Sequence, residues 1–277
     1  MENGKRLMDN RYEKLKEIVN EMGRVLVAFS GGVDSTFLLK TTTDLLSRKN
    51  VLAVTAISGT MSRQEHSDAV AYAETLQVEH IMVDSKELDI PEFVKNPPDK
   101  CYICKKHRFS KLLQIAQEKG FDFVADGENT DDRLDYRPGS LAAKELGIRS
   151  PLREAGLTKQ DIRRLSKQLG LPSWNKPSFA CLASRIPYHQ EITLEKLAQV
   201  DKAEQFLRGM GFLPQLRVRH YGDIAKIEPD EKDMEKLTRG DMRNKIVPYF
   251  KSLGFMFITM DLEGYRMGSL NQGTGKK

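Results

Sequence analysis

The chain has 277 residues, 39% of them hydrophobic and 30% charged, which suffices for one large domain or for one domain with a smaller appendage. Its net charge is only +5, from 44 basic and 39 acidic residues that are dispersed along the sequence. This pattern suits a small anionic ligand such as a nucleotide and argues against a nucleic-acid partner, which would require a clustered basic face. No apolar run approaches a membrane span, and the first residues lack the apolar stretch of a secretion signal, so we expect a cytoplasmic protein without a membrane partner.

The first two thirds of the sequence alternate short apolar runs with segments of helical periodicity. Strands are predicted at Val25–Phe29, Val51–Ile57, His80–Val83 and Phe121–Ala125, with a short fifth at Ile148–Ser150. Helices are predicted at Tyr12–Met22, Thr36–Ser47, Arg63–Leu76, Lys105–Lys119 and Gly139–Leu146. This alternation is typical of an α/β fold, with a parallel twisted sheet covered by helices on both faces. The carboxyl ends of the strands border the ligand in such sheets, so the loops that follow them should surround one crevice.

A different pattern begins near Pro187. It combines two helical stretches, Leu194–Met210 and Met242–Leu253, with strand-like runs at Leu216–His220, Ile224–Ile227 and Phe255–Met260. This mixture predicts a small α+β domain. We therefore expect a nucleotide-binding domain at residues 1–187 and a domain for substrate binding or oligomerisation at residues 188–277.

The strand at Val25–Phe29 leads directly into a Ser-Gly-Gly-Val-Asp-Ser turn at residues 30–35, after which a helical pattern resumes. The two adjacent glycines let backbone N–H groups turn inward as an anion-binding nest at the positive end of that helix. Ser30 and Ser35 add hydroxyl donors, and Asp34 offers a carboxylate that can hold Mg²⁺ against a phosphate. No lysine is present, so the G-x-x-x-x-G-K-[ST] P-loop is excluded, and a plain glycine turn is the remaining alternative.

This hexapeptide resembles the PP-loop signature of the ATP pyrophosphatases, which split ATP into AMP and pyrophosphate. The resemblance implies an enzyme that adenylates a substrate oxygen with ATP and Mg²⁺. The loop after the fourth predicted strand adds four acidic side chains in residues 126–132, which would repel one another unless a cation balances them. We expect Asp34 and Glu128 to hold Mg²⁺; a solvated acidic turn is the alternative for this loop. The residues expected to contact ATP or its pyrophosphate are Ser30, Gly31, Gly32, Asp34, Ser35, Asp126 and Gly127.

The chain contains three cysteines. An odd count without an export signal argues against a disulfide framework. Cys101 and Cys104 form a C-x-x-C motif, while Cys181 stands alone far downstream. Together with His107 they could form a closed Cys₃His zinc site. A thioredoxin-like redox pair and three unrelated buried thiols are further alternatives, although the flanking residues and the C-x-x-C spacing fit them poorly.

Several further motifs sharpen the resemblance. Besides the PP-loop they are Asp-Tyr-Arg-Pro-Gly at 135–139, Trp-Asn-Lys at 174–176, Ala-Ser-Arg-Ile-Pro-Tyr at 183–188 and Arg-Val-Arg at 217–219. Over most of its length the chain resembles the LarE family, sulfur transferases of nickel-pincer cofactor biosynthesis that serve lactate racemase. The resemblance implies adenylation of a carboxylate of pyridinium-3,5-biscarboxylic acid mononucleotide, after which sulfur replaces its oxygen to give a thiocarboxylate.

Two sulfur sources occur in that family. One branch sacrifices an enzyme cysteine, while the other holds a [4Fe-4S] cluster on three cysteines and leaves the fourth iron open for a sulfide. We favour a cluster on Cys101, Cys104 and Cys181, because a sacrificial enzyme would need only Cys181. The expected cofactors are thus ATP, Mg²⁺ and the [4Fe-4S] cluster, with zinc, or a sacrificial cysteine and no metal, as the alternatives.

The resemblance also implies which side chains contact the substrate. Arg217 and Arg219 lie two apart on a predicted strand, so both point to one face and can grip a phosphate; a solvated strand face is the alternative. Arg137 is a further candidate for a phosphate or carboxylate. The residues expected to act in catalysis are Cys181, Asp34 and Arg185, and those expected to hold the substrate phosphate or carboxylate are Arg217, Arg219, Arg185 and Lys105.

Two rival functions stay open. One is a PP-loop enzyme that thiolates tRNA, and the other is a zinc-stapled, non-catalytic nucleotide-binding regulator. The dispersed charge favours a small mononucleotide over RNA. The resemblance implies a homo-oligomer. His80, His189 and His220 fit no pattern, and we expect them on the surface or in loops.

Overall fold

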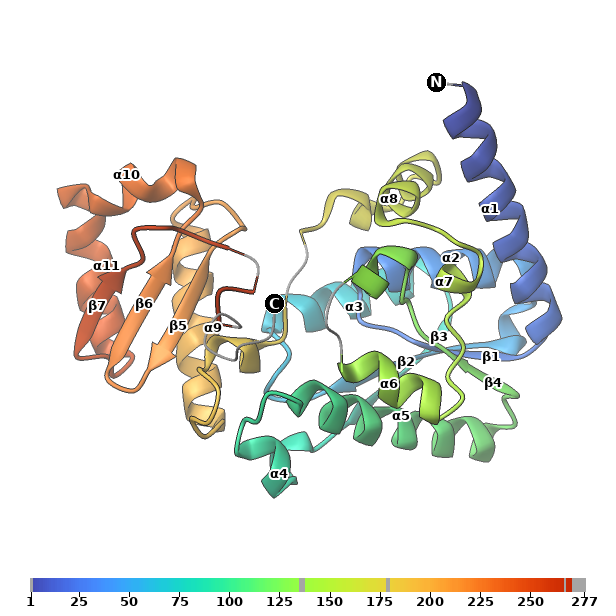
Figure 1. Cartoon of the computed structure of the whole chain (residues 1–277), viewed down its shortest axis with the longest axis horizontal. Helices are drawn as coiled ribbons and strands as arrows, with labels where there is room; N and C mark the ends of the chain where they lie inside the picture. The colour runs from blue at the N-terminus through green and yellow to red at the C-terminus, as the bar shows by residue number, and fades with distance from the viewer. Residues whose placement is uncertain (1, 135–137, 178–179, 267, 271–277) are drawn as a thin grey trace. The chain divides into compact units, whose positions relative to one another are not determined.

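The computed structural model describes residues 2–134, 138–177, 180–266 and 268–270, which form two compact units (Figure 1). The N-terminal unit comprises Met1–Ser58, Arg63–Glu87 and Asp99–Ser178. The C-terminal unit comprises Gly59–Ser62, Leu88–Pro98 and Phe179–Lys277. Two short segments from the first half of the chain therefore belong to the C-terminal unit.

A parallel sheet of four strands, in the order β3-β2-β1-β4, forms the centre of the N-terminal unit. The strands are β1 (Val25–Ala28), β2 (Val51–Ile57), β3 (Glu79–Asp84) and β4 (Phe123–Ala125). Most residues of the central strands β1 and β2 are buried, and both faces of the sheet are covered, so these strands have continuous rather than alternating apolar sequences. The α/β fold expected from the sequence is confirmed.

Helices lie on both faces of this sheet, with α5 and α6 on one side and α2 and α3 on the other (Figure 1). The helices of this unit are α1 (Glu2–Met22), α2 (Val33–Leu45), α3 (Arg63–Leu76), α5 (Lys100–Lys119), α6 (Pro138–Glu145), α7 (Pro151–Glu154) and α8 (Lys159–Gln168). Phe109 and Leu112 of α5 pack against Leu26, Leu52 and Val54 of the sheet. This packing brings the beginning of α5 to the carboxyl-end side of the strands, where the ligand loops lie.

Two expectations for this unit need correction. The predicted fifth strand at Ile148–Ser150 is only an isolated bridge between Arg149 and Ala125. The helix expected from Lys105 begins at Lys100, so both cysteines of the C-x-x-C motif lie within its first turns rather than before it. The apolar periodicity starts only after these turns, which is why it placed the beginning of the helix too late.

A mixed sheet of three strands, in the order β5-β6-β7, forms the C-terminal unit. Strands β5 (Arg217–Tyr221) and β6 (Ile224–Glu228) are antiparallel, and β7 (Phe257–Met260) runs parallel to β6. The helices of this unit are α4 (Pro91–Val94), α9 (Leu194–Gly209), α10 (Met234–Thr238) and α11 (Gly240–Ser252). The α+β pattern expected here is confirmed.

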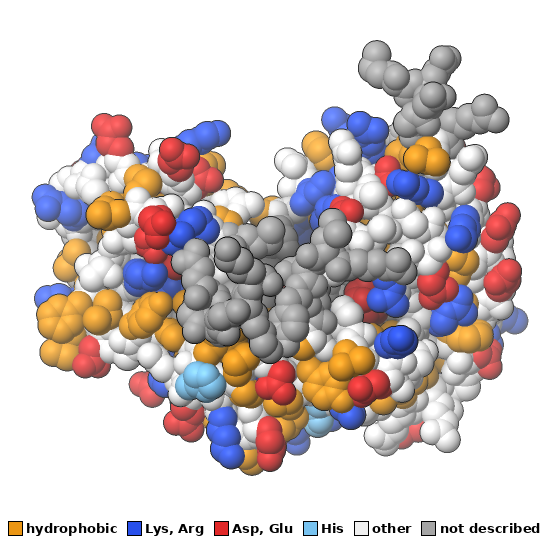
Figure 2. All heavy atoms as spheres, in the orientation of Figure 1, with side chains coloured by type: hydrophobic (Ala, Val, Ile, Leu, Met, Phe, Trp, Pro, Cys, Tyr) orange, Lys and Arg blue, Asp and Glu red, His pale blue; other side chains and the backbone are white. Residues whose placement is uncertain are grey.

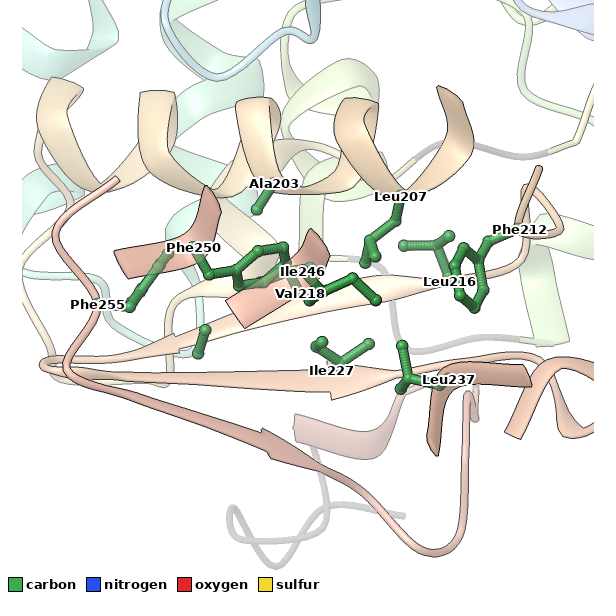
Figure 3. Packing of buried hydrophobic residues seen from close by; sticks show 11 residues of the cluster. Ala203, Leu207, Phe212, Leu216, Val218, Ile227, Leu237, Ile246, Phe250 and Phe255 are labelled. Atoms are coloured by element: carbon green, nitrogen blue, oxygen red, sulfur yellow. The ribbon is translucent and has the colours of Figure 1, made fainter. Parts of the chain in front are cut away.

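One face of the mixed sheet carries the core of this unit. Ala203 and Leu207 of α9 face Val218 of β5, next to Phe250 of α11 (Figure 3). Burial of each large apolar side chain contributes about 1.5–3 kcal/mol, so this cluster anchors α9 on the sheet. His220 is buried too, with its ring 2.8 Å from Gln199, and the expectation of a surface histidine is wrong there.

None of the helices in the described part of the chain is both long enough and apolar enough to cross a bilayer. On the faces of the two units seen in Figure 2, Lys and Arg side chains lie among Asp and Glu side chains. This mixing agrees with the dispersed charge of the sequence.

Candidate active site

The loop between β1 and α2 is shaped by Gly31. Its φ of +65° lies in the left-handed region, and an added Cβ would lie 2.8 Å from the backbone nitrogen of Ala69 and 2.9 Å from its Cα. A side chain at this position would therefore collide with the backbone of α3. Gly32 forms the N-cap of α2 and has no side chain to accept from the first amides of the helix, which stay available to an anion.

Two serines hold this loop closed. The Ser30 backbone N–H donates to the Ser35 hydroxyl at 3.3 Å, and the two hydroxyl oxygens are 3.1 Å apart. The Ser35 hydroxyl also donates to the Gly32 carbonyl at 3.3 Å. The loop is thus preorganised before any ligand enters, which favours electrostatic stabilisation of a phosphate.

The loop after β4 lies against the loop after β1. An added Cβ on Gly127 would lie 3.0 Å from the backbone nitrogen of Ser35 and 3.3 Å from the Cβ of Asp34. Strands β1 and β4 are neighbours in the sheet, and the chain order reverses between them. Open α/β sheets bind their ligands at such a switch point.

Two carboxylates here keep an unsatisfied buried oxygen. Oδ2 of Asp34 pairs with the Lys159 ammonium, but Oδ1 has no hydrogen-bond partner among the described residues. Oδ1 of Asp126 accepts from the Glu128 backbone N–H at 3.1 Å and from the Ser150 hydroxyl at 2.8 Å, while Oδ2 likewise lacks a partner in the described chain. Burial raises the pKa of Asp34, although Lys159 opposes the shift, and raises the pKa of Asp126 to about 6.

Glu128, in the same loop, is fully engaged. Its carboxylate accepts from Lys105 at 2.8 Å, from Arg153 at 2.8 Å and from the Ser140 hydroxyl at 2.7 Å. Burial acts to raise the pKa of Glu128, but Lys105, Ser140 and Arg153 outweigh it and lower the pKa. The oxygens that fit a hard cation such as Mg²⁺ are therefore those of Asp34 and Asp126. The expectation that Glu128 holds Mg²⁺ stays a prediction.

The C-x-x-C cysteines lie three residues apart on α5 and so share one face of the helix. Cys101 is exposed and Cys104 is partly buried, with its sulfur 3.9 Å from Oε1 of the fully buried Glu87. Nε2 of His107 lies 2.6 Å from the Ser85 carbonyl oxygen. A carbonyl oxygen can only accept a hydrogen bond, so Nε2 carries the proton and donates it. Within the ranges that the structure describes, no three Cys, His, Asp or Glu side chains are grouped as they would be around a metal ion.

The loop that carries Cys181 is tied to the C-terminal unit by Arg185. Cys181 is exposed at the start of the short 3₁₀ helix Leu182–Arg185, whereas the side chain of Arg185 is 1% exposed. Its guanidinium donates to both oxygens of Glu204 on α9, at 2.8 and 3.0 Å, and to the Ala180 carbonyl at 2.6 Å. Burial acts against the ionised form of Glu204, but Arg185 and Arg208 lower its pKa to about 2.

The two arginines of β5 are also buried, with 3% and 5% of their surface exposed, so the alternative of a solvated strand face is wrong. Arg219 pairs with Glu228 at 2.7 Å and donates to the Ser184 carbonyl at 2.7 Å and to the Ser269 hydroxyl at 2.9 Å. The Arg217 guanidinium lies 4.8 Å from the centre of the Tyr265 ring. Burial and the charge of Arg185 lower the pKa of Arg217 to about 10.

Comparison with known proteins now decides the family. The NAD synthase family model matches residues 7–103. The pyridinium-3,5-bisthiocarboxylic acid mononucleotide synthase of Lactiplantibacillus plantarum is 41% identical over 254 residues, which cover 91% of each chain. The chain belongs to the LarE family. The resemblance seen in the motifs is thereby confirmed.

Two further proteins of similar length are also similar to this chain. An uncharacterized protein of Synechocystis is 41% identical over 96% of this chain and 98% of its own. An uncharacterized protein of Methanocaldococcus jannaschii is 31% identical over 94% of this chain and 96% of its own. The match thus extends through both compact units.

The positions of the expected LarE site residues divide between the two units. The N-terminal unit brings together the PP-loop, Asp126, Gly127 and Glu128, with Lys105 on Glu128. Arg185, Arg217 and Arg219 share the C-terminal unit with Cys181. Residues 135–137, including the candidate Arg137, lie outside the described residues. That these side chains contact the substrate stays a prediction.

Sequence reasoning missed Lys159, whose ammonium pairs with Asp34 across 125 positions of sequence. It also missed the partners of the buried arginines, Glu204 and Glu228. The sequence offered one indication, which is the absence of a lysine from the PP-loop. A phosphate-binding loop without its own lysine needs a cation from another segment of the chain. Nothing in the pattern pointed to a particular residue.

Proposed function

We propose that this chain is an ATP-dependent sulfur transferase of nickel-pincer nucleotide cofactor biosynthesis. It adenylates a carboxylate of pyridinium-3,5-biscarboxylic acid mononucleotide and converts that carboxylate to a thiocarboxylate. The observation that carries the proposal is the 41% identity to the Lactiplantibacillus plantarum synthase over 91% of each chain. The geometry of the PP-loop supports it, because the free amides at the beginning of α2 and the hydroxyls of Ser30 and Ser35 can bind a polyphosphate.

In the first step a substrate carboxylate oxygen attacks the α-phosphorus of ATP, and pyrophosphate leaves. The amides at the beginning of α2 and the hydroxyls of Ser30 and Ser35 stabilise the negative charge on the departing pyrophosphate. Asp34 and Asp126 would hold Mg²⁺ through their unsatisfied oxygens. When bound, the ion would neutralise charge between the phosphates.

In the second step a sulfur nucleophile attacks the carbonyl carbon of the acyl-adenylate and expels AMP, which leaves a thiocarboxylate. For the sulfur source we favour a [4Fe-4S] cluster on Cys101, Cys104 and Cys181, and Cys181 as a sacrificial donor is the alternative. When bound, the cluster would supply sulfide. Two thiols on one face at the beginning of a helix fit such a role, because both sulfur atoms can reach one cluster.

The substrate phosphate and carboxylates are assigned to Arg217, Arg219, Arg185 and Lys105. Support comes from Arg219, whose Nη2 pairs with Glu228 at 2.7 Å and also donates to a neutral hydroxyl, that of Ser269, at 2.9 Å. A phosphate oxygen in that place would form a stronger, charge-assisted hydrogen bond. The chain is further proposed to bind nucleotide through residues 1–187, and to bind the substrate through residues 188–277 together with Arg185 and Lys105. It is also proposed to form a homo-oligomer, which light scattering after gel filtration would measure.

Replacement of Cys181 by alanine separates the two steps. We expect Cys181→Ala to release pyrophosphate within about twofold of the wild-type rate, because the PP-loop is untouched, and to form no thiocarboxylate. Mass spectrometry of the mononucleotide and a pyrophosphate assay measure the two outcomes. Full thiocarboxylate formation by this variant would remove Cys181 from the mechanism.

The metal content tests the sulfur source. Anaerobically purified wild-type protein should contain iron and labile sulfide, and Cys101→Ser should lose both while it still binds ATP. Iron-free protein that forms one thiocarboxylate per chain and leaves dehydroalanine at 181 would support the sacrificial route instead. Zinc without iron or labile sulfide would support the zinc-stapled regulator.

A further inference from the structure

The PP-loop has no lysine of its own, yet two lysines from later in the sequence reach it. The Lys176 ammonium donates to the Gly31 carbonyl at 2.9 Å. The Lys159 ammonium pairs with the Asp34 carboxylate. Both lysines lie in the same compact unit as the loop.

The two lysines differ in how firmly they are held. Lys176 is also paired with Asp68 at 2.6 Å, and its side chain is 9% exposed, so it braces the backbone of the loop. The side chain of Lys159 is 32% exposed. An ammonium has three donors, so Lys159 can bind a second anionic oxygen without leaving its site.

The base of Lys159 is fixed. It is the first residue of α8, whose N-cap Thr158 forms a capping box with Asp161. Its backbone N–H donates to Oδ2 of Asp131 at 2.8 Å. The helix start is therefore rigid, while the four-carbon side chain that crosses to Asp34 can adjust.

Asp34 shows why this lysine is needed. Its Oδ1 is buried and has no partner among the described residues, and Oδ2 of Asp126 in the adjoining loop is in the same state. An uncompensated pair of buried carboxylates would be costly. In the nucleotide-free chain the Lys159 ammonium supplies the compensating charge on Asp34.

We propose that Lys159 is the phosphate-binding lysine of this ATP site. It neutralises Asp34 while the site is empty, and it donates to an ATP phosphate oxygen once Mg²⁺ bridges the nucleotide and the Asp34 carboxylate. This assignment rests on the proposed ATP-dependent function. It gives the loop the cation that other phosphate loops carry within their own motif.

The experiment compares Lys159→Met with wild type by two binding measurements on the full chain. The first is the affinity for the Mg²⁺ complex of an ATP analogue with a methylene group between the α- and β-phosphorus atoms. The second is the affinity for Mn²⁺ alone, followed by electron paramagnetic resonance. Lys167→Met is the matched control, since Lys167 lies on the same helix over the Trp174 ring.

We expect Lys159→Met to bind the analogue about 10- to 100-fold more weakly, which is the loss of one charge-assisted hydrogen bond. It should bind Mn²⁺ alone more tightly than wild type, because Asp34 is no longer neutralised. Lys159→Arg should recover part of the analogue affinity, and Lys167→Met should match wild type in both measurements.

Changes of opposite sign distinguish this role from a structural one. If Lys159→Met binds the analogue as wild type does, or loses affinity for the analogue and for Mn²⁺ alike, the assignment is overturned. If wild type itself does not bind the analogue, the proposed function fails instead. Thermal unfolding of each variant shows whether a loss of affinity reflects a misfolded chain. If Lys159→Met is misfolded, the analogue affinity of Lys159→Arg decides whether the assignment stands.

Discussion

The buried carboxylates at the PP-loop and those beside the loop of Cys181 differ in how completely they are paired. In the N-terminal unit, Asp34 and Asp126 each leave one buried oxygen without a partner among the described residues. In the C-terminal unit, both oxygens of Glu204 are bonded to arginines. Both oxygens of Glu228 are likewise paired with basic side chains, those of Lys226 and Arg219.

This difference indicates different tasks. An unsatisfied buried oxygen weakens the fold, and it persists where a ligand completes its coordination. A satisfied buried ion pair holds the chain in one arrangement, and the removal of one partner leaves the other charge uncompensated. The N-terminal unit is therefore prepared for a cation and a nucleotide, whereas the ion pairs of the C-terminal unit fix the loop of Cys181.

The largest effect is expected for Glu204→Gln, which breaks the closed network. The free energy of unfolding should fall by about 3–5 kcal/mol at pH 7, because buried Arg185 loses its counter-charge. Glu195→Gln on the exposed side of α9 is the control. Urea unfolding measures both, and equal small losses would show that the network does not hold the unit together.

The pH dependence of that loss has a definite sign. The pKa of Glu204 is about 2 in the folded chain against an ordinary 4.5, so its stabilisation is complete above pH 4.5 and disappears as the pH falls toward 2. The difference between wild type and Glu204→Gln should therefore shrink over this interval. A difference that does not depend on pH would contradict the assigned ionisation.

Asp126→Asn should have the opposite effect on stability. Burial raises the pKa of Asp126 from 3.8 to about 6, so the folded chain binds a proton more readily than the unfolded chain, and stability falls as the pH rises through this interval. Removal of the charge should stabilise the nucleotide-free chain by up to about 3 kcal/mol at pH 7. It should also abolish the Mg²⁺ dependence of nucleotide binding.

Glu128→Gln is the matched comparison for Asp126→Asn. Because Glu128 is paired with Lys105 and Arg153, its replacement should destabilise the chain by about 1–3 kcal/mol. Asp122→Asn, at an exposed position before β4, should change little. If Asp126→Asn and Glu128→Gln both destabilise the chain in urea unfolding, the unsatisfied oxygen of Asp126 is not the defining feature of this loop.

The smallest effect is expected for Ser269→Ala. Its hydroxyl bonds Arg219 at 2.9 Å, but Glu228 also pairs with that guanidinium at 2.7 Å. The free energy of unfolding should therefore fall by less than about 1 kcal/mol. Ser252→Ala on α11 serves as the control. A loss of several kcal/mol would mean that the hydroxyl, and not Glu228, holds Arg219 in place.

The sequence was sufficient for the central sheet and its phosphate loop. Apolar runs bounded by glycine and serine placed β1 and β2 to within one residue, because buried parallel strands leave a continuous apolar signal. The PP-loop is six consecutive residues, so its conformation follows from local backbone preferences. Because β1 and β4 are adjacent strands, the loops that follow them meet, and Gly127 lies against Ser35.

What the sequence could not provide are pairings that packing alone decides. Lys159 meets Asp34, and Arg185 meets Glu204, through the docking of helices on sheets. A buried arginine and a solvated one look alike in a sequence, because only the folded chain shows which carboxylate lies opposite. The same applies to His220, whose burial follows from the position of α9 over β5.

The path of Lys105 joins the acidic loop to the beginning of α5. Its side chain passes so close to Gly139 that an added Cβ there would lie 2.6 Å from the Lys105 Cδ, and its ammonium then meets Glu128 at 2.8 Å. Lys105 directly follows Cys104 in α5. One ion pair and one peptide unit therefore connect the acidic loop to the residue that carries a thiol. A side chain at position 139 would displace Lys105 and strain this connection.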